Sequence, residues 1–397
     1  MRLPIYMDCH ATTPVDPAVL EAMLPYLTEH FGNAASRSHS FGWVAARALE
    51  ESRAQVAALL GAEPREIVFT SGATESIHLG VRGALRARRA RGRHVVTTAI
   101  EHKAVLGALR ELESDGWETT VVGVGADGVV SVADIVAALR PDTVLVCVMA
   151  ANNEIGTLQP LAEIGKATRA RGILFFSDAA QAVGKIPLDV DALQLDLLAL
   201  SAHKLYGPKG VGALYVRRRG EPVRLAPVSP GGGQERGLRS GTQNVPGIVG
   251  LGRACAVAGA GLATEAERLR SLRETLRKGL VEALPDVRVN GALEPRLPGN
   301  LNLSFAGVQG EALLMQLNDI AVSPGAACDS QNSEPSHVLR AIGVPDDLAR
   351  SSIRFGLGRF NTAAEVDYVI AKVIDVVQRL RGASPLYAAR AFQEGVS

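Results

Sequence analysis

The sequence has almost no excess of charge of either sign. Its 397 residues include 42 Lys and Arg against 41 Asp and Glu. We therefore expect no global field that would attract nucleic acid, an anionic membrane or a polyanionic substrate, and a small molecule suits the chain better. Because 47% of the residues are hydrophobic, the chain can bury a large core, and its length suggests two or three domains of a soluble globular protein.

Long hydrophobic runs are also scarce. Residues 1–8 contain no apolar stretch of signal-peptide length. We expect charges or prolines to interrupt every later run before it reaches membrane-spanning length. The sequence therefore predicts a cytoplasmic protein with no membrane partner.

The cysteine spacings of zinc and redox sites are missing. The four cysteines lie far apart, at Cys9, Cys147, Cys255 and Cys328. At most one of these thiols needs a chemical role, and we interpret Cys147 and Cys255 as small core residues. Three histidines that match no ligand spacing are expected to be structural: His10, His39 and His337. We expect no metal site.

Helical patterns alternate with short apolar strands from about residue 50 to 220. The strands are predicted at residues 66–70, 94–98, 144–149, 173–177, 196–201 and 212–217. This alternation indicates an α/β fold with a mostly parallel sheet flanked by helices. A long helical stretch follows the glycine-rich residues 231–242 and ends near Leu284. We expect a large domain over residues 15–261 and a smaller domain formed by residues 1–14 and 262–397.

A local basic run lies at the end of a predicted helix. It contains six arginines, at Arg82, Arg86, Arg88, Arg89, Arg91 and Arg93. We interpret the run as a solvated helix end, and a docking patch is the alternative.

A glycine-containing turn between a strand and a helix spans Phe69-Thr-Ser-Gly-Ala-Thr-Glu-Ser76. Backbone amides, the Thr74 hydroxyl and the positive end of the helix dipole meet there, and together they favour a bound phosphate. The alternative is that Thr74 or Ser71 only caps the helix.

Two ionisable residues lie where apolar strands end. Asp178 follows the strand at 173–177, where open parallel sheets place their ligands, and a carboxylate there can keep a pyridine nitrogen protonated. Lys204 ends the next strand segment, and a partly desolvated lysine can form a Schiff base with an aldehyde. Taken alone, Asp178 also fits an N-cap and Lys204 a surface lysine. Together with the phosphate turn, they supply the three edges of a pyridoxal phosphate site.

Seven segments carry a resemblance to a known family: Ser71-Gly-Ala-Thr-Glu-Ser76, Glu101-His-Lys-Ala-Val105, Asn152-Asn-Glu-Ile-Gly156, Asp178-Ala-Ala-Gln181, Ser201-Ala-His-Lys204, Arg239-Ser-Gly-Thr242 and Ser352-Ile-Arg-Phe355. The chain resembles the cysteine desulfurases of the class V aminotransferase fold, in particular the NifS/IscS-like group, over residues 3–386. The resemblance implies a homodimeric transferase of fold type I that depends on pyridoxal 5′-phosphate (PLP). It also implies a large, mainly parallel seven-stranded sheet domain and a smaller α+β domain.

The resemblance further implies which residues hold the cofactor. Lys204 carries PLP, Asp178 pairs with the pyridine nitrogen and Gln181 reaches the ring hydroxyl. His102 stacks on the ring, although its sequence context also fits a core histidine. The residues implied around the phosphate are Ala73, Thr74, Ser201 and His203, with Thr242 contributed by the partner subunit.

Substrate binding is implied for Asn33, Asn153 and Arg354, and Asn153 also counts among the cofactor residues. The arginine fork suits a carboxylate because it binds both oxygens at once. A buried structural ion pair is the alternative role for Arg354.

Cys328 lies among small, polar and turn-forming residues at 322–335, which predict a loop before a helix. The resemblance implies that its thiolate takes the sulfur of L-cysteine as a persulfide, with Lys204 and His102 as the other catalytic residues and L-alanine as the product. The implied receiver is an acceptor protein, such as a cluster scaffold or a thiolation carrier. With a scaffold, Cys328 is a candidate for transient sharing of an iron–sulfur cluster.

The chain departs from the family pattern in this loop, at Pro324, Ala326 and Asp329, and Cys9-His10 replaces a common Tyr-Ser pair. A carboxylate beside the thiol disfavours the thiolate and Pro324 stiffens the backbone, so we expect altered loop motion or acceptor choice. The alternatives to a desulfurase are a selenocysteine lyase, an aminotransferase of the same fold, and a catalytically silent sulfur-relay partner.

Overall fold

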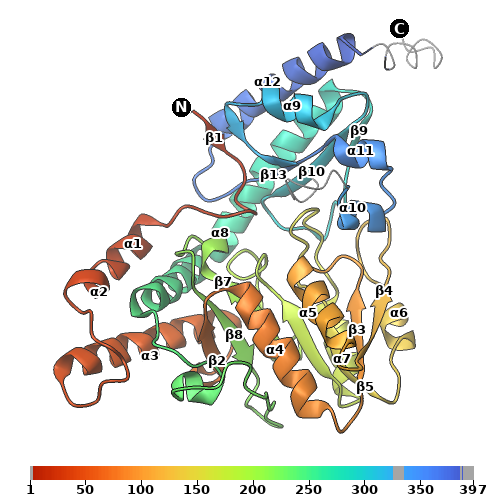
Figure 1. Ribbon diagram of the computed structural model, residues 1–397. Helices are drawn as coiled ribbons and strands as arrows, with labels where there is room; N and C mark the ends of the chain where they lie inside the picture. The colour runs from red at the N-terminus through yellow and green to blue at the C-terminus, as the bar shows by residue number, and fades with distance from the viewer. Residues whose placement is uncertain (1–2, 325–334, 385–386, 388–397) are drawn as a thin grey trace.

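The computed structural model describes residues 3–324, 335–384 and 387 (Figure 1). Its larger layer is a seven-stranded sheet with the spatial order β2 (Ile67–Thr70), β8 (Gly212–Val216), β7 (Leu197–Ser201), β6 (Leu174–Asp178), β5 (Thr143–Cys147), β3 (His94–Thr98) and β4 (Glu118–Val122). Strand β8 is antiparallel to both of its neighbours, and the other pairs are parallel. The predicted α/β class and the mainly parallel seven-stranded sheet are confirmed.

The six strands predicted from apolar runs all form, with ends within two residues of the predicted ones. Five of these six, all but β3, are rich in large apolar residues, and every residue of the six strands is buried. Strand β4 was not predicted. Its sequence Glu-Thr-Thr-Val-Val is only partly buried because it forms the edge of the sheet beside β3. A polar edge strand carries little of the apolar signal on which the prediction depends.

Helices cover both faces of this sheet, because side chains along a strand point alternately to its two faces. In β8, Leu214 and Val216 pack with α4 and α5, whereas Ala213 and Tyr215 pack with α3, α7 and α8. The helices of this layer are α1 (Pro17–Met23), α2 (Pro25–Thr28), α3 (Ser40–Leu60), α4 (Ala73–Arg88), α5 (Lys103–Glu113), α6 (Val132–Ala137), α7 (Leu161–Arg169) and α8 (Val245–Ala283). Short 3-10 turns lie at Pro64–Glu66, Ala202–Lys204 and Gln234–Gly237.

A second, smaller layer is built on an antiparallel sheet with the order β12 (Ser323–Pro324), β13 (Ser352–Gly356), β10 (Asn300–Phe305) and β9 (Val287–Val289). Its helices are α9 (Gly310–Gln316), α10 (His337–Ala341), α11 (Asp346–Arg350) and α12 (Ala363–Gly382). Strand β1 (Ile5–Tyr6) pairs in parallel with β11 (Ile320–Ala321), and Ile5 joins the core of this layer. The first strand of the chain therefore packs with its C-terminal part.

Helix α8 belongs to both layers and runs from one into the other (Figure 1). Leu251 lies in the core under the large sheet, while Leu276 lies in the core of the second layer. The domain boundary proposed near residue 262 falls inside this helix and stays a prediction.

The same helix bears on the expectation about hydrophobic runs. From Val245 to Thr264 the only charged residue is Arg253, which together with Pro246 interrupts this run. In the described part of the chain, α8 is the one helix long and apolar enough to cross a membrane by length and composition. In the most apolar stretch of 18 residues in this helix, 50% is buried inside the protein, as in the core helix of a globular fold.

Candidate active site

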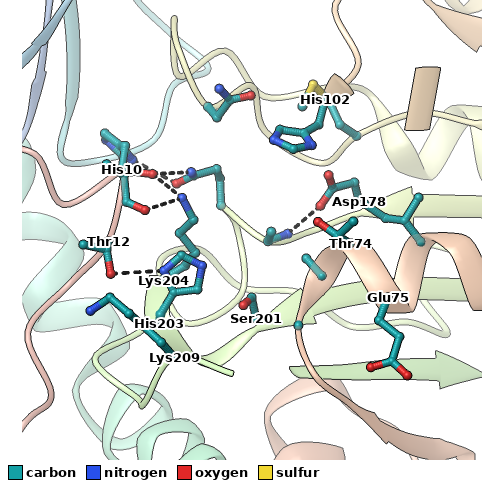
Figure 2. Close-up of a pocket in the computed structure, with 18 of the residues that line it drawn as sticks. His10, Thr12, Thr74, Glu75, His102, Asp178, Ser201, His203, Lys204 and Lys209 are labelled. Atoms are coloured by element: carbon teal, nitrogen blue, oxygen red, sulfur yellow. Dashed lines mark hydrogen bonds between the residues drawn. The ribbon is translucent and has the colours of Figure 1, made fainter. Parts of the chain in front are cut away.

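A cavity of about 640 Å³ lies at the carboxyl ends of β2, β6 and β7 (Figure 2). Parallel sheets place ligands at this edge. Most of the predicted site residues line the cavity: Ala73, Thr74, His102, Asn153, Asp178, Gln181, Ser201, His203, Lys204 and Arg354. They come from both layers of the protein, since Arg354 lies on β13.

Lys204 ends the 3-10 turn that directly follows β7, and its partly buried side chain lines the cavity. Its Nζ donates hydrogen bonds to the carbonyl oxygens of His10, at 2.5 Å, and Ala11, at 2.8 Å. Burial and the nearby charge of Arg354 lower the pKa of Lys204 to about 8. An amine with this pKa is partly neutral near physiological pH, as a nucleophilic lysine must be.

Asp178 is the last residue of β6 and is buried. Its Oδ1 accepts a hydrogen bond from the Ala180 amide at 3.0 Å, but turns rather than a helix follow, so the proposed N-cap role is wrong. Burial raises the pKa of this carboxyl group, while the nearby His102 and Lys204 act in the opposite direction. A cationic group placed against Asp178 would therefore be stabilised by it.

The turn between β2 and α4 opens onto the same cavity. Gly72 occupies the N-cap position and no side chain caps the helix, so the alternative role of Thr74 or Ser71 as a cap is wrong. The amides of the first turn thus keep their hydrogen-bonding capacity for a ligand. Strand β8 begins very close to the turn, because a Cβ atom on Gly212 would lie 2.7 Å from the Cα of Gly72. Glycine at residue 212 is therefore required by this close approach.

His102 also lines the cavity (Figure 2). It caps α5, with Nδ1 accepting a hydrogen bond from the Ala104 amide at 3.1 Å, which leaves Nε2 to carry the proton in the neutral ring. The side chain is exposed rather than packed in a core, so the alternative role as a core histidine is wrong. Partial desolvation lowers the pKa of His102, which favours the neutral ring.

His10 is a site residue that sequence reasoning missed. Its buried ring lies in the cavity wall, with Nδ1 3.0 Å from Gln181 Oε1, and its carbonyl oxygen accepts from Gln181 Nε2 at 2.9 Å. Lys185 Nζ donates to the same Gln181 Oε1 at 3.0 Å, and burial together with the charge of Lys204 lowers the pKa of Lys185 to about 7. These contacts fix the orientation of the Gln181 amide.

Two of the three histidines expected to be structural do make structural contacts. His39 caps α3 by accepting from the Gly42 amide, and His337 Nε2 lies 3.0 Å from the Glu101 carbonyl oxygen. His10 had no sequence signal beyond the unusual Cys9-His10 pair. Among the described residues, no group of three or more His, Cys, Asp or Glu is placed to hold a metal ion.

Arg354 reaches the cavity from β13 and makes the ion pair that was its alternative role. Nη2 lies 2.9 Å from Asp8 Oδ1, and it also donates to Ser323 Oγ at 3.0 Å. Nη1 donates to the carbonyl oxygen of Asn153 at 3.0 Å. Its buried Nε has no partner within the described residues. The guanidinium is therefore held in place by three hydrogen bonds, and two of its five N–H donors, one on Nε and one on Nη1, have no partner among the described residues.

Two of the predicted site residues that the structure describes do not line this cavity. Asn33 is exposed and accepts a hydrogen bond from the Ala35 amide at 2.9 Å, and Thr242 is exposed on the surface of its own chain. The contribution of Thr242 was implied for the partner subunit. Cys328, with Ala326 and Asp329, lies outside the described residues.

Comparisons with known proteins agree with this geometry. The chain matches the Aminotransferase class-V family over residues 5–369. It is 58% identical over 387 residues to the cysteine desulfurase IscS of Anaeromyxobacter dehalogenans (strain 2CP-C), a match that covers 98% of this chain and 96% of that protein. A solved NifS-like protein is similar with a TM-score of 0.87 at 40% identity, over 95% of this chain and 100% of the other. SspA in complex with cysteine is similar with a TM-score of 0.79 at 38% identity, over 90% of this chain and 100% of the other. This chain belongs to the class V aminotransferase family and, within it, to the NifS/IscS-like cysteine desulfurases.

Proposed function

We propose that this protein uses PLP to convert L-cysteine to L-alanine and transfers the sulfur to its own Cys328. The observation that carries the proposal is the convergence of Lys204, Asp178 and His102 on one cavity, beside an uncapped helix start. The solved structure of the similar SspA with cysteine supports the choice of substrate. Incubating the purified protein with L-cysteine and measuring alanine and sulfide tests the reaction, and equal turnover of selenocysteine would favour a selenocysteine lyase.

The residues present fit PLP at each of its functional groups. The buried carboxylate of Asp178 suits a protonated ring nitrogen, and Gln181 would reach the ring hydroxyl, as the family implies. The first-turn amides of α4, with Thr74, Ser201 and His203, suit the phosphate. When bound, PLP supplies an electron sink for the bonds broken at the substrate Cα. His102 would cover the ring and exclude water from it.

Lys204 would hold the cofactor and then move the substrate α proton. A base for this proton must lie in the cavity and must be neutral for part of the time. The Lys204 amine lies in the cavity, and its pKa of about 8 lets it accept a proton without being permanently charged. The carbonyl oxygens of His10 and Ala11 give the ammonium form a resting position.

The rate at which cofactor-free protein captures PLP is expected to rise with pH and to level off above about pH 8. The neutral amine is the nucleophile, so below this pKa its fraction grows roughly tenfold per pH unit. Because the charge of Arg354 lowers the pKa of Lys204, Arg354→Met is expected to move the midpoint to higher pH. Stopped-flow absorbance measures both profiles. A rate that keeps rising to pH 10 in the unmodified protein would contradict the assignment.

Arg354 and Asn153 would bind the substrate carboxylate. Arg354→Lys is expected to raise the KM for L-cysteine roughly 10- to 100-fold, with a smaller effect on kcat, because lysine lacks the two-pronged fork and the hydrogen bonds that hold it. Arg359→Lys is the matched control, since Arg359 pairs with Asp16 and Glu265 outside the cavity. An unchanged KM in the Arg354 variant would exclude this role.

In the sulfur step, the Cys328 thiolate would attack the sulfur of the bound substrate. An S–S bond forms while the C–S bond of the substrate breaks, and the electron pair left on carbon takes up a proton to give alanine. His102 is the proposed base for the thiol.

The described residues on either side of Cys328 support this step. Ser323 and Pro324 pair with Arg354 and Ile353 on β13. Ser336 donates a hydrogen bond to Glu154, the residue after Asn153. Both ends of the segment that carries Cys328 are therefore attached beside the substrate-binding residues.

We also propose that the protein is a homodimer. Large apolar side chains are exposed together along residues 20–43: Leu20, Leu24, Leu27, Phe31, Phe41 and Trp43. Exposed apolar patches of this kind mark interaction sites. In a dimer, each subunit would also bring its Thr242 to the candidate active site of the other subunit. Light scattering is expected to give twice the mass of the chain, and a single-chain mass at micromolar concentration would contradict the proposal.

We further propose a cytoplasmic location and an acceptor protein for the sulfur, with neither nucleic acid nor membrane as a partner.

A further inference from the structure

A second cavity lies at the opposite end of the sheet strands from the candidate active site. Its volume is about 330 Å³, and it forms where β5 and β6 begin. Four arginines from three segments line it. Arg88 ends α4 and Arg91 follows it, Arg140 precedes β5, and Arg171 precedes β6. Two arginines of the basic run noted in the sequence, Arg88 and Arg91, thus line a cavity as well as lying at a helix end.

One of the four arginines is already neutralised. Arg140 binds both carboxylate oxygens of Asp142, at 2.9 and 2.8 Å, and its Nη1 lies 2.6 Å from Glu118 Oε2. Its charge is therefore matched by the protein itself.

The other three arginines bind only neutral groups or none. Arg88 Nη1 donates to the Gly172 carbonyl oxygen at 2.7 Å, and Arg171 Nη1 donates to the Ala167 carbonyl oxygen at 3.0 Å. Within residues 3–324, 335–384 and 387, no carboxylate lies at ion-pair distance from Arg88, Arg91 or Arg171. A carbonyl oxygen orients a guanidinium without neutralising its charge, so three positive charges share one cavity.

The electrostatics of Arg88 agree with this crowding. Its side chain is half-buried, and burial together with the charge of Arg91 lowers its pKa, although Asp196 and Glu221 act in the opposite direction. Arg91 and Arg171 are exposed at the rim of the cavity. A bound anion would offset both effects on Arg88, because it brings negative charge next to a guanidinium that has partly lost its water.

The rest of the lining is mainly apolar, with Leu139, Pro141, Val144 and Ile173 beside Thr143 and Gly172. We propose that this cavity binds a small organic phosphate with at least two negative charges, of the class of a nucleoside diphosphate. Its phosphates would lie between Arg88, Arg91 and Arg171, with the organic part against the apolar wall. A diphosphate suits the site better than a single carboxylate, because it offers several oxygen pairs to the guanidinium forks that converge there. The volume lies at the lower end of the usual range of roughly 300–1,000 Å³ for ligand sites.

The test is titration calorimetry on the PLP-loaded protein at constant ionic strength. Loading with PLP keeps the cofactor phosphate site filled. ADP and inorganic pyrophosphate are expected to bind saturably, and inorganic phosphate more weakly. The Arg88→Gln/Arg91→Gln variant is expected to lose at least about tenfold in affinity for both, since it removes two of three unmatched charges but keeps amide donors.

Arg86→Gln is the matched control, because Arg86 is exposed on the same helix and does not line the cavity. It is expected to bind as the unmodified protein does. An Arg88→Lys/Arg91→Lys variant, which keeps the charges, is expected to retain part of the affinity and separates charge from folding. Absence of saturable binding by ADP and pyrophosphate, or equal affinity in the Gln variant, would overturn the site. Equal affinity for ADP and pyrophosphate would show that the organic part of the ligand gains nothing from the apolar wall, and would contradict that part of the proposal. None of these outcomes depends on the desulfurase activity.

Discussion

Replacing Lys204 by alanine is expected to lower the rate of alanine formation from L-cysteine by at least about 10³-fold, because it removes both the attachment of the cofactor and the base for the α proton. The measurement is alanine produced per active site at saturating L-cysteine. Borohydride reduction followed by intact mass gives a second readout, since the unmodified chain is expected to gain the mass of the reduced cofactor and the variant is not.

Lys209→Ala is the control for this experiment. Lys209 lines the same cavity, so its removal tests whether any positive charge there suffices. We expect it to keep the cofactor adduct and most of the activity. If the Lys204 variant still carried a borohydride-stable adduct on another lysine, the assignment would fall.

Replacing Cys328 by alanine is expected to reduce sulfide release from L-cysteine under reductant to about 1% or less, because none of the three cysteines among the described residues is exposed to accept the sulfur. Cys9, Cys147 and Cys255 are buried, and burial raises the pKa of each of their thiols. The visible spectrum of the cofactor is expected to stay unchanged in the variant, so that loss of sulfur transfer is separated from loss of cofactor.

Cys255→Ala serves as the control, since it removes a buried thiol from α8 and is expected to leave sulfide release near its original level. Full sulfide release from the Cys328 variant would show that the sulfur leaves without a covalent enzyme intermediate. That result would not affect the roles assigned to Lys204 and Asp178, and it would exclude only Cys328 as the sulfur acceptor.

The residues that could be predicted from the sequence share a physical origin. Asp178 ends an apolar strand, Lys204 and the turn at Thr74 each follow one, and the carboxyl ends of parallel strands meet at one edge of a sheet. Strand ends are local features, so their patterns are visible in a single sequence. The number of strands in the sheet, by contrast, was implied only by the family resemblance, and their spatial order was not predicted.

The contacts that could not be predicted join distant parts of the chain. His10 meets Gln181, and Arg354 meets Asp8, without any local pattern that signals the pairing. The Arg88 cavity is of the same kind, because its arginines come from three segments that only the sheet brings together. Thr242 differs again, since its implied role depends on a partner subunit and its position within one chain does not test that role. Asn33 was expected to bind substrate and is exposed outside the cavity.

The sharing of α8 between the two layers has a consequence for anyone who wishes to dissect this protein. A fragment ending at residue 261 would keep Leu251 packed under the large sheet but would lose the half of the helix that carries Leu269, Leu272, Leu276 and Leu280. The complementary piece would leave β11 without its only strand partner, β1, which comes from the other end of the chain. Neither piece therefore has a complete core, so the two layers are expected to unfold as one cooperative unit. Swapping the Cys328 segment between relatives would accordingly be done by exchanging the short stretch between β12 and α10, not by exchanging domains.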